Sequence, residues 1–304
     1  MVTHSITRRL SLAVRGMRLP FLTVSILPYT YGAFLAPQPL YPTRFLLGLC
    51  AVACAHLSAN LMNDYADSRT GVDWRDPIHR GYFGGSKLIQ AGLATERTYL
   101  ASALAFAAVG LACATVLALL LASLWAPLIF VAVQTLAWSY SVRPLQLSYA
   151  RLGEACIFLL FGPASVLTGL SVQTMTWPAG RAVFGSLPFG FFTVAVLLAN
   201  EVPDRKDDLA VGKNNLVNGL SPSLAWLPYL LSSVIGLVSV VWAWSLGLLG
   251  FRALFSLSVL FPVLAAAGIL AKHGEDKSRV TSASKLALVA HMGVGLFLIM
   301  DALS

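Results

Sequence analysis

Residues 98–142 read TYLASALAFAAVGLACATVLALLLASLWAPLIFVAVQTLAWSYSV, and no residue in this stretch is charged. A bilayer core about 30 Å thick is crossed by roughly 20 helical residues. A run of 45 uncharged residues is therefore long enough for two crossings. Ser123 and Pro127 predict a break between the two helices near the middle of the run. The stretch indicates a pair of transmembrane helices.

Seven further uncharged runs extend this pattern along the chain. They cover 19–43, 45–63, 155–180, 182–200, 214–251, 253–271 and 286–300. The run at 214–251 opens with a loop composition, so we expect its helix to begin at about residue 223. Alternation with a period of two is absent, and a helix satisfies its own backbone in hydrocarbon. The runs therefore predict an all-α polytopic membrane protein with nine transmembrane helices.

The composition excludes most other classes of protein. The chain has 304 residues, of which 57% are apolar and 11% are charged. Soluble domains carry about 25% charged residues. The composition is also unlike that of a disordered, collagenous or disulfide-rich secreted chain. The four cysteines lie in or at the ends of predicted helices without metal-binding spacing, so we interpret them as packing residues.

The basic residues predict the orientation of the helices. With the N-terminus in the cytoplasm, the outer loops contain only Arg44, Arg181 and Arg252. The other 18 of the 21 Lys and Arg residues then lie on the inner side, as the positive-inside rule requires. The formal charge of +8 is mainly this topology signal, and a nucleic-acid partner is not expected. We expect a multi-pass protein of a bacterial cytoplasmic (inner) membrane.

Acidic residues concentrate in two short inner-side segments, after the second and the sixth predicted helix. Eight of the 13 acidic residues lie in these segments: Asp64, Asp67, Asp73, Asp76, Glu201, Asp204, Asp207 and Asp208. The outer loops contain no acidic residue, and the inner loop at 141–154 contains only Glu154. Ordinary solvation would spread acidic residues over every inner loop. The two segments therefore indicate a site that requires negative charge.

Both segments place their polar side chains on one helix face. In the first, Asn60, Asn63, Asp64 and Asp67 stand at i, i+3, i+4 and i+7; in the second, Asn200, Asp204 and Asp208 stand at i, i+4 and i+8. The two motifs are offset by 137 residues. Similar faces at the same membrane level predict one shared site between two pseudo-repeat halves, at about 19–142 and 152–302.

Carboxylate and amide oxygens that crowd together repel one another unless a cation lies among them. Mg²⁺ takes oxygen ligands and commonly bridges carboxylates to substrate phosphates. We therefore predict a Mg²⁺-diphosphate site at the membrane surface. The alternative is that the acidic residues are solvated helix ends with local partners such as Arg69 and Arg205.

Three basic residues lie at the same level. They are Lys87 in GGSKLIQAG, Arg143 in YSVRPLQL and Lys213 in AVGKNN. Such side chains bind phosphate oxygens that a metal leaves free, although each also fits a positive-inside membrane anchor. Asn60, one turn before Asn63, completes the expected substrate-binding group.

Two histidines lie inside predicted helices. His56 lies one to two turns before Asn60 and Asn63 on the same face. It either lines the site or hydrogen-bonds to a neighbouring helix. His291 has no acidic neighbour in sequence, and we interpret it as a packing residue.

The segments NDYADSRTGVD (63–73), YSVRPLQLSYARLGE (140–154) and NEVPDRKDDLAVGKNNLV (200–217) resemble the UbiA superfamily of intramembrane prenyltransferases. They are most similar to the 1,4-dihydroxy-2-naphthoate prenyltransferase branch of menaquinone synthesis. The resemblance covers nearly the whole chain, which we treat as a single membrane-embedded domain, 1–304. One departure is Gly71, where the superfamily commonly has an Asp; the third acid here is Asp73.

The resemblance implies nine helices around a central cavity that opens to the cytoplasmic side. It implies that Mg²⁺ and the diphosphate of a polyprenyl donor bind at the two motifs, through Asn63, Asp64, Asp67, Asn200, Asp204 and Asp208. Asp64, Asp67, Asp204 and Asp208 would then be catalytic. Tyr140 would stabilise the allylic cation through its ring face, unless it is an interfacial anchor. The implied reaction is prenyl transfer to an aromatic acceptor, in quinone biosynthesis.

Other functions remain compatible with the same motifs. A lipid-type acceptor, or cyclisation of the prenyl chain, would also use a Mg²⁺-diphosphate site. A cation-coupled transporter would keep its acidic residues near the bilayer midplane, whereas these flank the helices at the inner surface. The sequence does not fix the length of the prenyl tail, the acceptor or the oligomeric state.

Overall fold

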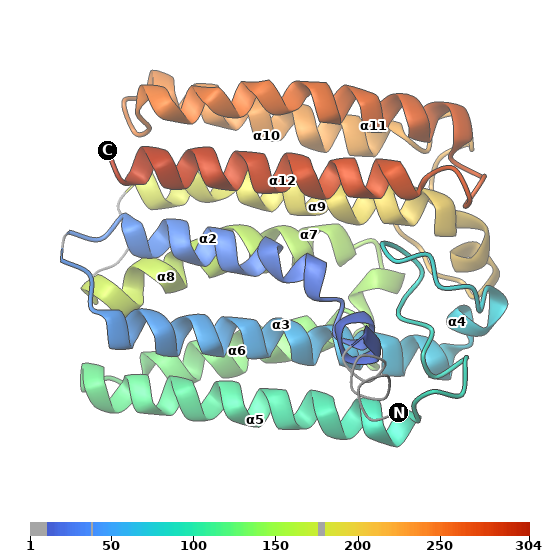
Figure 1. The fold of residues 1–304 in the computed structure, drawn as a ribbon, viewed down its shortest axis with the longest axis horizontal. Coiled ribbons are helices and arrows are strands. Elements are labelled where there is room, and N and C mark those ends of the chain that lie inside the picture. Colours follow the sequence, from blue (N-terminus) through green and yellow to red (C-terminus); the bar gives the residue numbers. More distant parts are fainter. Residues whose placement is uncertain (1–10, 38, 176–179) are drawn as a thin grey trace, which may run out of the picture.

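The computed structural model describes residues 11–37, 39–175 and 180–304. Every regular element in these ranges is helical, and the long helices lie side by side with their axes roughly parallel (Figure 1). In chain order the elements are η1 (Leu19–Leu22), α2 (Thr23–Phe34), α3 (Pro42–Thr70), α4 (Val72–Arg75), α5 (Glu96–Leu121), α6 (Trp125–Ser139), η2 (Leu147–Tyr149), α7 (Gly153–Leu159), η3 (Leu160–Ala164), α8 (Ser165–Thr174), α9 (Gly180–Ala210), α10 (Leu227–Ser245), η4 (Phe251–Val259), α11 (Leu260–His273) and α12 (Thr281–Ala302). The all-α prediction is confirmed.

Most of the predicted spanning helices are long in the structure. Within the described ranges, seven helices are long and apolar enough to cross a membrane, and two of the nine predicted segments are shorter. The two short ones are α2, with 12 residues, and α6, with 15. Pro37 and Pro39 stop α2, because proline neither donates a hydrogen bond nor continues a helix. Ala122, in the left-handed conformation at φ 48°, separates α5 from α6.

Three consecutive elements, α7, η3 and α8, form one continuous helical rod. The α-helices α7 and α8 are joined by η3, a π-helical turn that contains Pro163. A π turn holds one more residue than an α turn, and such turns often lie at functional sites. Both α7 and η3 pack on α9. The turn therefore sets how α8 is rotated relative to α7.

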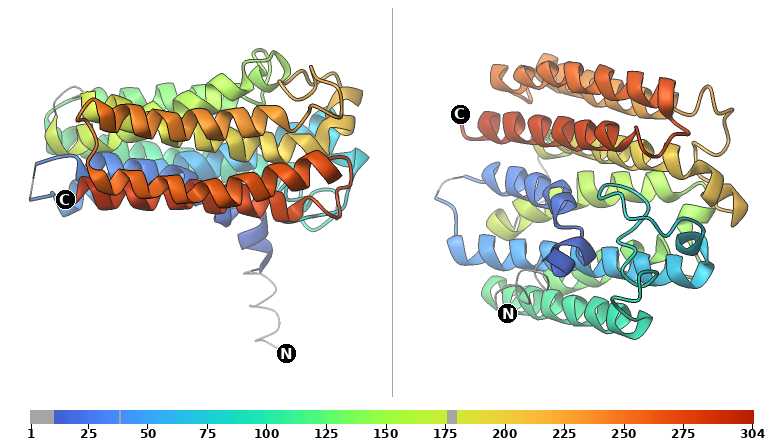
Figure 2. Two further views of the ribbon diagram at one scale, coloured as in Figure 1. Left: turned by 90° about the horizontal axis from the view of Figure 1, so that it is seen from above. Right: turned by 45° about the vertical axis from the view of Figure 1, so that its right-hand side comes forward.

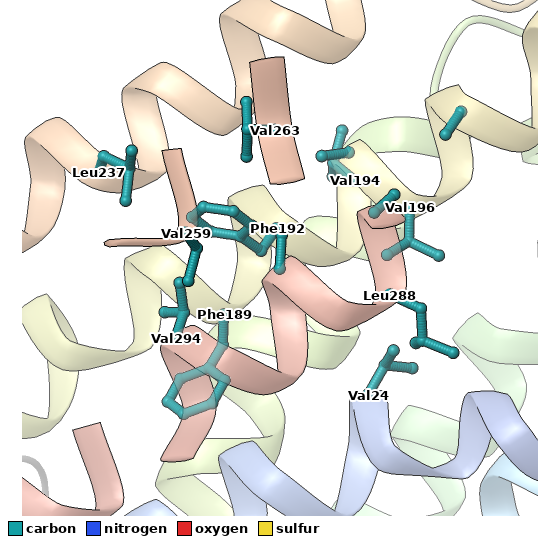
Figure 3. Close-up of a cluster of buried hydrophobic side chains, with 14 of the residues drawn as sticks. Val24, Phe189, Phe192, Val194, Val196, Leu237, Val259, Val263, Leu288 and Val294 are labelled. Carbon is teal, nitrogen blue, oxygen red and sulfur yellow. The ribbon is translucent and has the colours of Figure 1, made fainter. Parts of the chain in front are cut away.

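Helix α9 lies at the centre of the bundle, and 72% of its most apolar stretch is buried. Figure 3 shows Phe189 and Phe192 of α9 among apolar side chains from α2, α10, α11 and α12, such as Leu237 and Val263. The outer helices instead expose large apolar side chains, including Leu119 on α5 and Phe261 on α11. Apolar surface of this kind is what a bilayer covers.

Small residues bring α2 and α8 into backbone contact. A Cβ on Gly32 would overlap the carbonyl oxygen of Val166, and a Cβ on Gly169 would overlap that of Tyr29. Close approach through glycine is typical of helix packing in membranes, where hydrophobicity does not drive association. This contact holds α2 beside the rod.

Both acidic segments lie on helical extensions beyond the apolar stretches. Helix α3 continues to Thr70 and α9 continues to Ala210. The α3–α5 connection, with α4, lies at the same end of the bundle in every view (Figures 1 and 2). That end carries the candidate site.

Candidate active site

The first acidic segment forms one wall of a cavity of about 220 Å³. Asn60, Asn63 and Asp67 of α3 line it. Asn63 Nδ2 donates to Asp67 Oδ2 at 3.2 Å and to Ser141 Oγ at 2.8 Å. These bonds fix the amide and the carboxylate of the motif against the start of the α6–α7 connection.

The second acidic segment lines the same cavity from α9. Asn200, Asp204 and Asp208 all contribute to its wall. Asp208 is buried and accepts a hydrogen bond from Asn215 Nδ2 at 3.3 Å. Oδ1 of Asn200 is buried without a hydrogen-bond partner in the described part of the chain. Two motifs that are 137 residues apart in the sequence therefore meet across one cavity.

Asp64 does not line the cavity and has other partners in this structure. Its carboxylate is bound by Arg18 and accepts a hydrogen bond from the Ser86 backbone N–H at 3.1 Å. On an α-helix consecutive residues point about 100° apart, so Asp64 faces away from its neighbour Asn63. Asp64 instead ties the chain before η1 and the loop after α4 to α3.

Arg143 also lies away from the cavity in this structure. Its side chain is exposed with Nε 3.3 Å from Gln146 Oε1. The other predicted phosphate-binding residues, Lys87 and Lys213, do line the cavity. So does Tyr140, at the C-terminal end of α6.

Lys87 forms a buried ion pair at the cavity wall. Its Nζ lies 2.8 Å from Asp73 Oδ1 and 3.2 Å from the Asp73 carbonyl oxygen. Burial and the nearby carboxylates of Asp67 and Asp64 raise the pKa of Asp73 to about 7, while Lys87 opposes them. Asp73 thus serves as the partner of Lys87 in this structure.

Lys213 neutralises the second motif. Its Nζ lies 3.5 Å from Asp208 Oδ1. Burial lowers the pKa of this ammonium, but the carboxylates of Asp208 and Asp67 outweigh burial, so its pKa lies well above the ordinary value. Lys213 therefore stays charged and is attracted to both motifs at once.

Two cations at the cavity were absent from the predicted set. Arg18 precedes η1, and Lys277 comes from the α11–α12 connection. Lys277 Nζ lies 2.7 Å from Asp207 Oδ2, 3.0 Å from Asp76 Oδ2 and 3.4 Å from Asp204 Oδ1. The only sequence signal for Lys277 is its place in a loop expected on the inner side.

A glycine pair lets the loop after α4 approach the acidic residues. Gly84 and Gly85 have φ of 71° and 79°, in the left-handed region that favours glycine. A Cβ on Gly85 would lie 2.8 Å from Asp73 Oδ2, and one on Gly84 would lie 3.6 Å from Asp204 Oδ1. This loop therefore packs its backbone against both acidic segments.

A second, apolar cavity of about 150 Å³ adjoins the first. Its wall comes from α3, α5, α6 and the α7–α8 rod. The side chains that line both cavities are His56, Ala59, Ala137, Leu160 and Phe161. The acid-lined cavity therefore lies next to an apolar one between the helices.

The donor atoms fit a hard divalent cation, although lysines hold some of them here. Within the described residues, no three His, Cys, Asp or Glu side chains already converge as a metal site. Asp204 and Asp208 contact Lys277 and Lys213 instead. Oδ1 of Asn200, buried and unpartnered within the described ranges, is an oxygen donor that a cation would satisfy.

Residues 25–290 match the UbiA prenyltransferase family, so the chain belongs to that family and is a multi-pass membrane protein. It is 31% identical over 175 residues to a 1,4-dihydroxy-2-naphthoate octaprenyltransferase of Mycobacterium tuberculosis. That match covers 57% of this chain and 56% of the relative, so the chain spans little more than half of the relative's length.

Solved structures share the fold. A UbiA homologue from Aeropyrum pernix K1, described as an apo structure, superimposes with a TM-score of 0.70 at 19% identity, over 92% of this chain and 97% of that one. A UbiA homologue from Archaeoglobus fulgidus, described as bound to GPP and Mg²⁺, gives a TM-score of 0.62 at 17% identity, over 95% and 99%. At these identities the likeness concerns the fold alone.

Proposed function

We propose that this member of the UbiA prenyltransferase family transfers a prenyl group from a prenyl diphosphate to an aromatic ring. One observation carries the proposal. The Asn and Asp side chains of α3 and α9 line one cavity, and an apolar cavity between the helices shares five of its lining residues. A diphosphate with a hydrocarbon tail has the same division into a charged end and an apolar end.

Mg²⁺ would be held by Asn63 and Asp67 of α3 and by Asn200, Asp204 and Asp208 of α9. When bound, it would supply Lewis-acid stabilisation of the negative charge on the departing diphosphate. The structure described as bound to GPP and Mg²⁺ supports this choice of metal by analogy of fold.

The basic residues of the cavity would bind the diphosphate oxygens. Lys87 and Lys213 lie in the wall, as do Arg18 and Lys277. Charge-assisted hydrogen bonds to phosphate are about twice as strong as neutral ones. Contacts that strengthen as charge develops on the leaving group lower the activation barrier.

In the proposed reaction the allylic carbon–oxygen bond breaks, and its electron pair leaves with the diphosphate. A ring carbon of the acceptor then forms the new carbon–carbon bond, and the proton that the ring loses passes to the released diphosphate. Tyr140 lines the cavity, and we assign to its ring face the stabilisation of the allylic cation. The apolar cavity would hold the tail and exclude water, which would otherwise capture the cation.

The relative from M. tuberculosis is named for a naphthoate acceptor and an octaprenyl donor. We therefore propose a quinone precursor, such as 1,4-dihydroxy-2-naphthoate, as the acceptor. The same site geometry would serve a lipid-type acceptor or a cyclisation, and the product distinguishes these cases.

We further propose that all nine helical segments take part in crossing the bilayer, with α2 and α6 as short members. The cavity would open to the cytoplasm, with the N-terminus inside, in a bacterial inner membrane. The halves at about 19–142 and 152–302 would each contribute one acidic motif, from α3 and from α9.

The test is product analysis with the purified full chain. The protein is incubated with Mg²⁺, geranyl or longer prenyl diphosphates, and aromatic or glycerol-phosphate acceptors, and products are identified by mass. Prenylated naphthoate that disappears with EDTA and returns with Mg²⁺ is expected. A cyclised hydrocarbon, or a prenylated glycerol phosphate alone, contradicts the assignment.

A further inference from the structure

The two cavities meet at a single titratable side chain, His56. It lies on α3, seven residues before Asn63, which is about 10 Å along the helix axis. The side chain is buried and lines both the acid-lined and the apolar cavity. His56 is therefore at the junction between the proposed diphosphate site and the proposed tail site.

The two ring nitrogens of His56 differ in their partners. Nδ1 lies 2.7 Å from Ser25 Oγ on α2. Nε2 is buried and has no hydrogen-bond partner among the described residues. A buried polar atom without a partner costs about 1–3 kcal/mol, and in native proteins such atoms call for a ligand or a water.

The surroundings restrict what could satisfy Nε2. The ring of Phe161 packs edge-on at 5.6 Å between centroids, and the other residues shared by the two cavities are Ala59, Ala137 and Leu160. A prenyl chain is hydrocarbon and offers no hydrogen bond. The diphosphate, in the proposed function, is held roughly 10 Å away at the acidic motifs. Apart from a water, the group in the proposed reaction that could pair with Nε2 is a ring hydroxyl of the acceptor, which is apolar in body and polar at one atom.

We infer that His56 holds the aromatic acceptor by a hydrogen bond between Nε2 and a ring hydroxyl, and that Ser25 orients the imidazole. This inference rests on the proposed function, because it presumes an aromatic acceptor. With the hydrogen on Nδ1 donated to Ser25 Oγ, Nε2 presents a lone pair that accepts the hydroxyl hydrogen. Such a bond increases electron density on the ring that attacks the allylic carbon.

The experiment measures binding of two probes to the full chain in detergent. The probes are 4-hydroxy-2-naphthoate and 4-methoxy-2-naphthoate, which differ only in the hydroxyl hydrogen and one methyl group. The wild type should bind the hydroxyl compound about tenfold more tightly, which corresponds to about 1.4 kcal/mol. His56→Leu should remove this preference, and His56→Gln, which keeps a polar atom, should retain part of it.

The control is the donor. Binding of geranyl diphosphate with Mg²⁺ should change less than about twofold in both variants, because the acidic motifs are left intact. If His56→Leu unfolds at a clearly lower temperature, Ser25→Ala replaces it, and the preference should fall at least about threefold as the imidazole loses its orientation.

Equal affinity of the wild type for the two probes, or an unchanged preference in His56→Leu, overturns the inference. Failure of the proposed function has another signature. A protein that prefers the hydroxyl probe but forms no prenylated product contradicts prenyl transfer and leaves the role of His56 intact. Product formation without a His56-dependent preference contradicts only the role of His56.

Discussion

Lys277 and Asp204, 73 residues apart in sequence, contact each other at 3.4 Å between Nζ and Oδ1. The lysine comes from the α11–α12 connection and the aspartate from α9. The same ammonium also contacts Asp76 and Asp207. The segment after α4, helix α9 and the α11–α12 connection therefore meet at one cation beside the second acidic motif.

We expect Lys277→Ala to raise the KM for prenyl diphosphate about five- to tenfold, roughly 1–1.4 kcal/mol. The variant leaves three carboxylates without their shared cation, so the donor diphosphate meets a more negative cavity. Steady-state kinetics with the donor varied at saturating acceptor and Mg²⁺ measures the effect. Lys206→Ala is the matched control, because Lys206 pairs with Glu275 on an exposed surface and such pairs contribute little. Equal effects of the two variants would contradict a role for Lys277 in donor binding.

Asp204→Asn and Asp67→Asn should each reduce kcat at least about 100-fold, which is roughly 2.7 kcal/mol of transition-state stabilisation. Each carboxylate belongs to a different wall of the cavity, so neither can replace the other. Initial rates and thermal unfolding in detergent are measured together. The control is Asp276→Asn, an exposed acid whose partners are Ser278 and Arg279. Near-normal activity in either motif variant would contradict a metal site shared by the two motifs.

Arg18→Ala should destabilise the protein much more than Arg69→Ala. Asp64, the partner of Arg18, is buried, and removing one member of a buried pair costs about 3–5 kcal/mol. Arg69 pairs with Glu96 in an exposed position, where a pair contributes about 0–1 kcal/mol. Thermal unfolding of both variants gives the comparison. Similar midpoints would show that Arg18 and Asp64 do not hold the chain before η1 against α3.

Gly85→Ala should impair both folding and activity, whereas Gly92→Ala should have a smaller effect. Both glycines have positive φ, so each substitution carries backbone strain of about 1 kcal/mol. Only at Gly85 does the added Cβ also collide with Asp73. The unfolding temperature and the KM for the donor are the readouts. Equal unfolding temperatures and equal KM values for Gly85→Ala and Gly92→Ala would mean that the protein does not need the close approach of this loop to the acidic residues.

The orientation can be tested by labelling single cysteines in a cysteine-free background. We expect Asp276→Cys to react with a membrane-impermeant maleimide only from the cytoplasmic side, and Arg44→Cys only from the outer side, because 18 of 21 basic residues then face inward. Right-side-out and inverted vesicles provide the two conditions. The reverse labelling pattern would place the site on the opposite face of the membrane.

Local patterns in the sequence were sufficient for the parts of the site carried by single helices. The spacing of Asn60, Asn63 and Asp67 placed them on one face of α3, and they line the cavity together. The same spacing places Asp64 on this face, whereas in this structure its carboxylate is bound by Arg18. Helix α2 ends at Phe34, well before the end of the uncharged run 19–43, because Pro37 and Pro39 follow it.

Contacts between segments far apart in the chain could not be predicted from the local sequence pattern. Lys277 meets acids that lie 70 to 201 residues away, and Arg18 meets one 46 residues away. Nothing local distinguishes these residues from the other inner-side cations. His56 was recognised as a possible cavity residue, but only the packing of α2 against α3 shows which of its nitrogens is left free.

The π-helical turn of η3 constrains how such a chain can evolve. Leu160 and Phe161, which line both cavities, lie in this turn, and α8 follows it directly. Deleting one residue there would rotate α8 by about 100° and carry Thr168 and Val172 away from the apolar cavity that they line. A lineage that accommodates longer or shorter tails is therefore expected to change side chains on α5 and α6, such as Leu117 and Phe130, while the length of this turn is inherited unchanged.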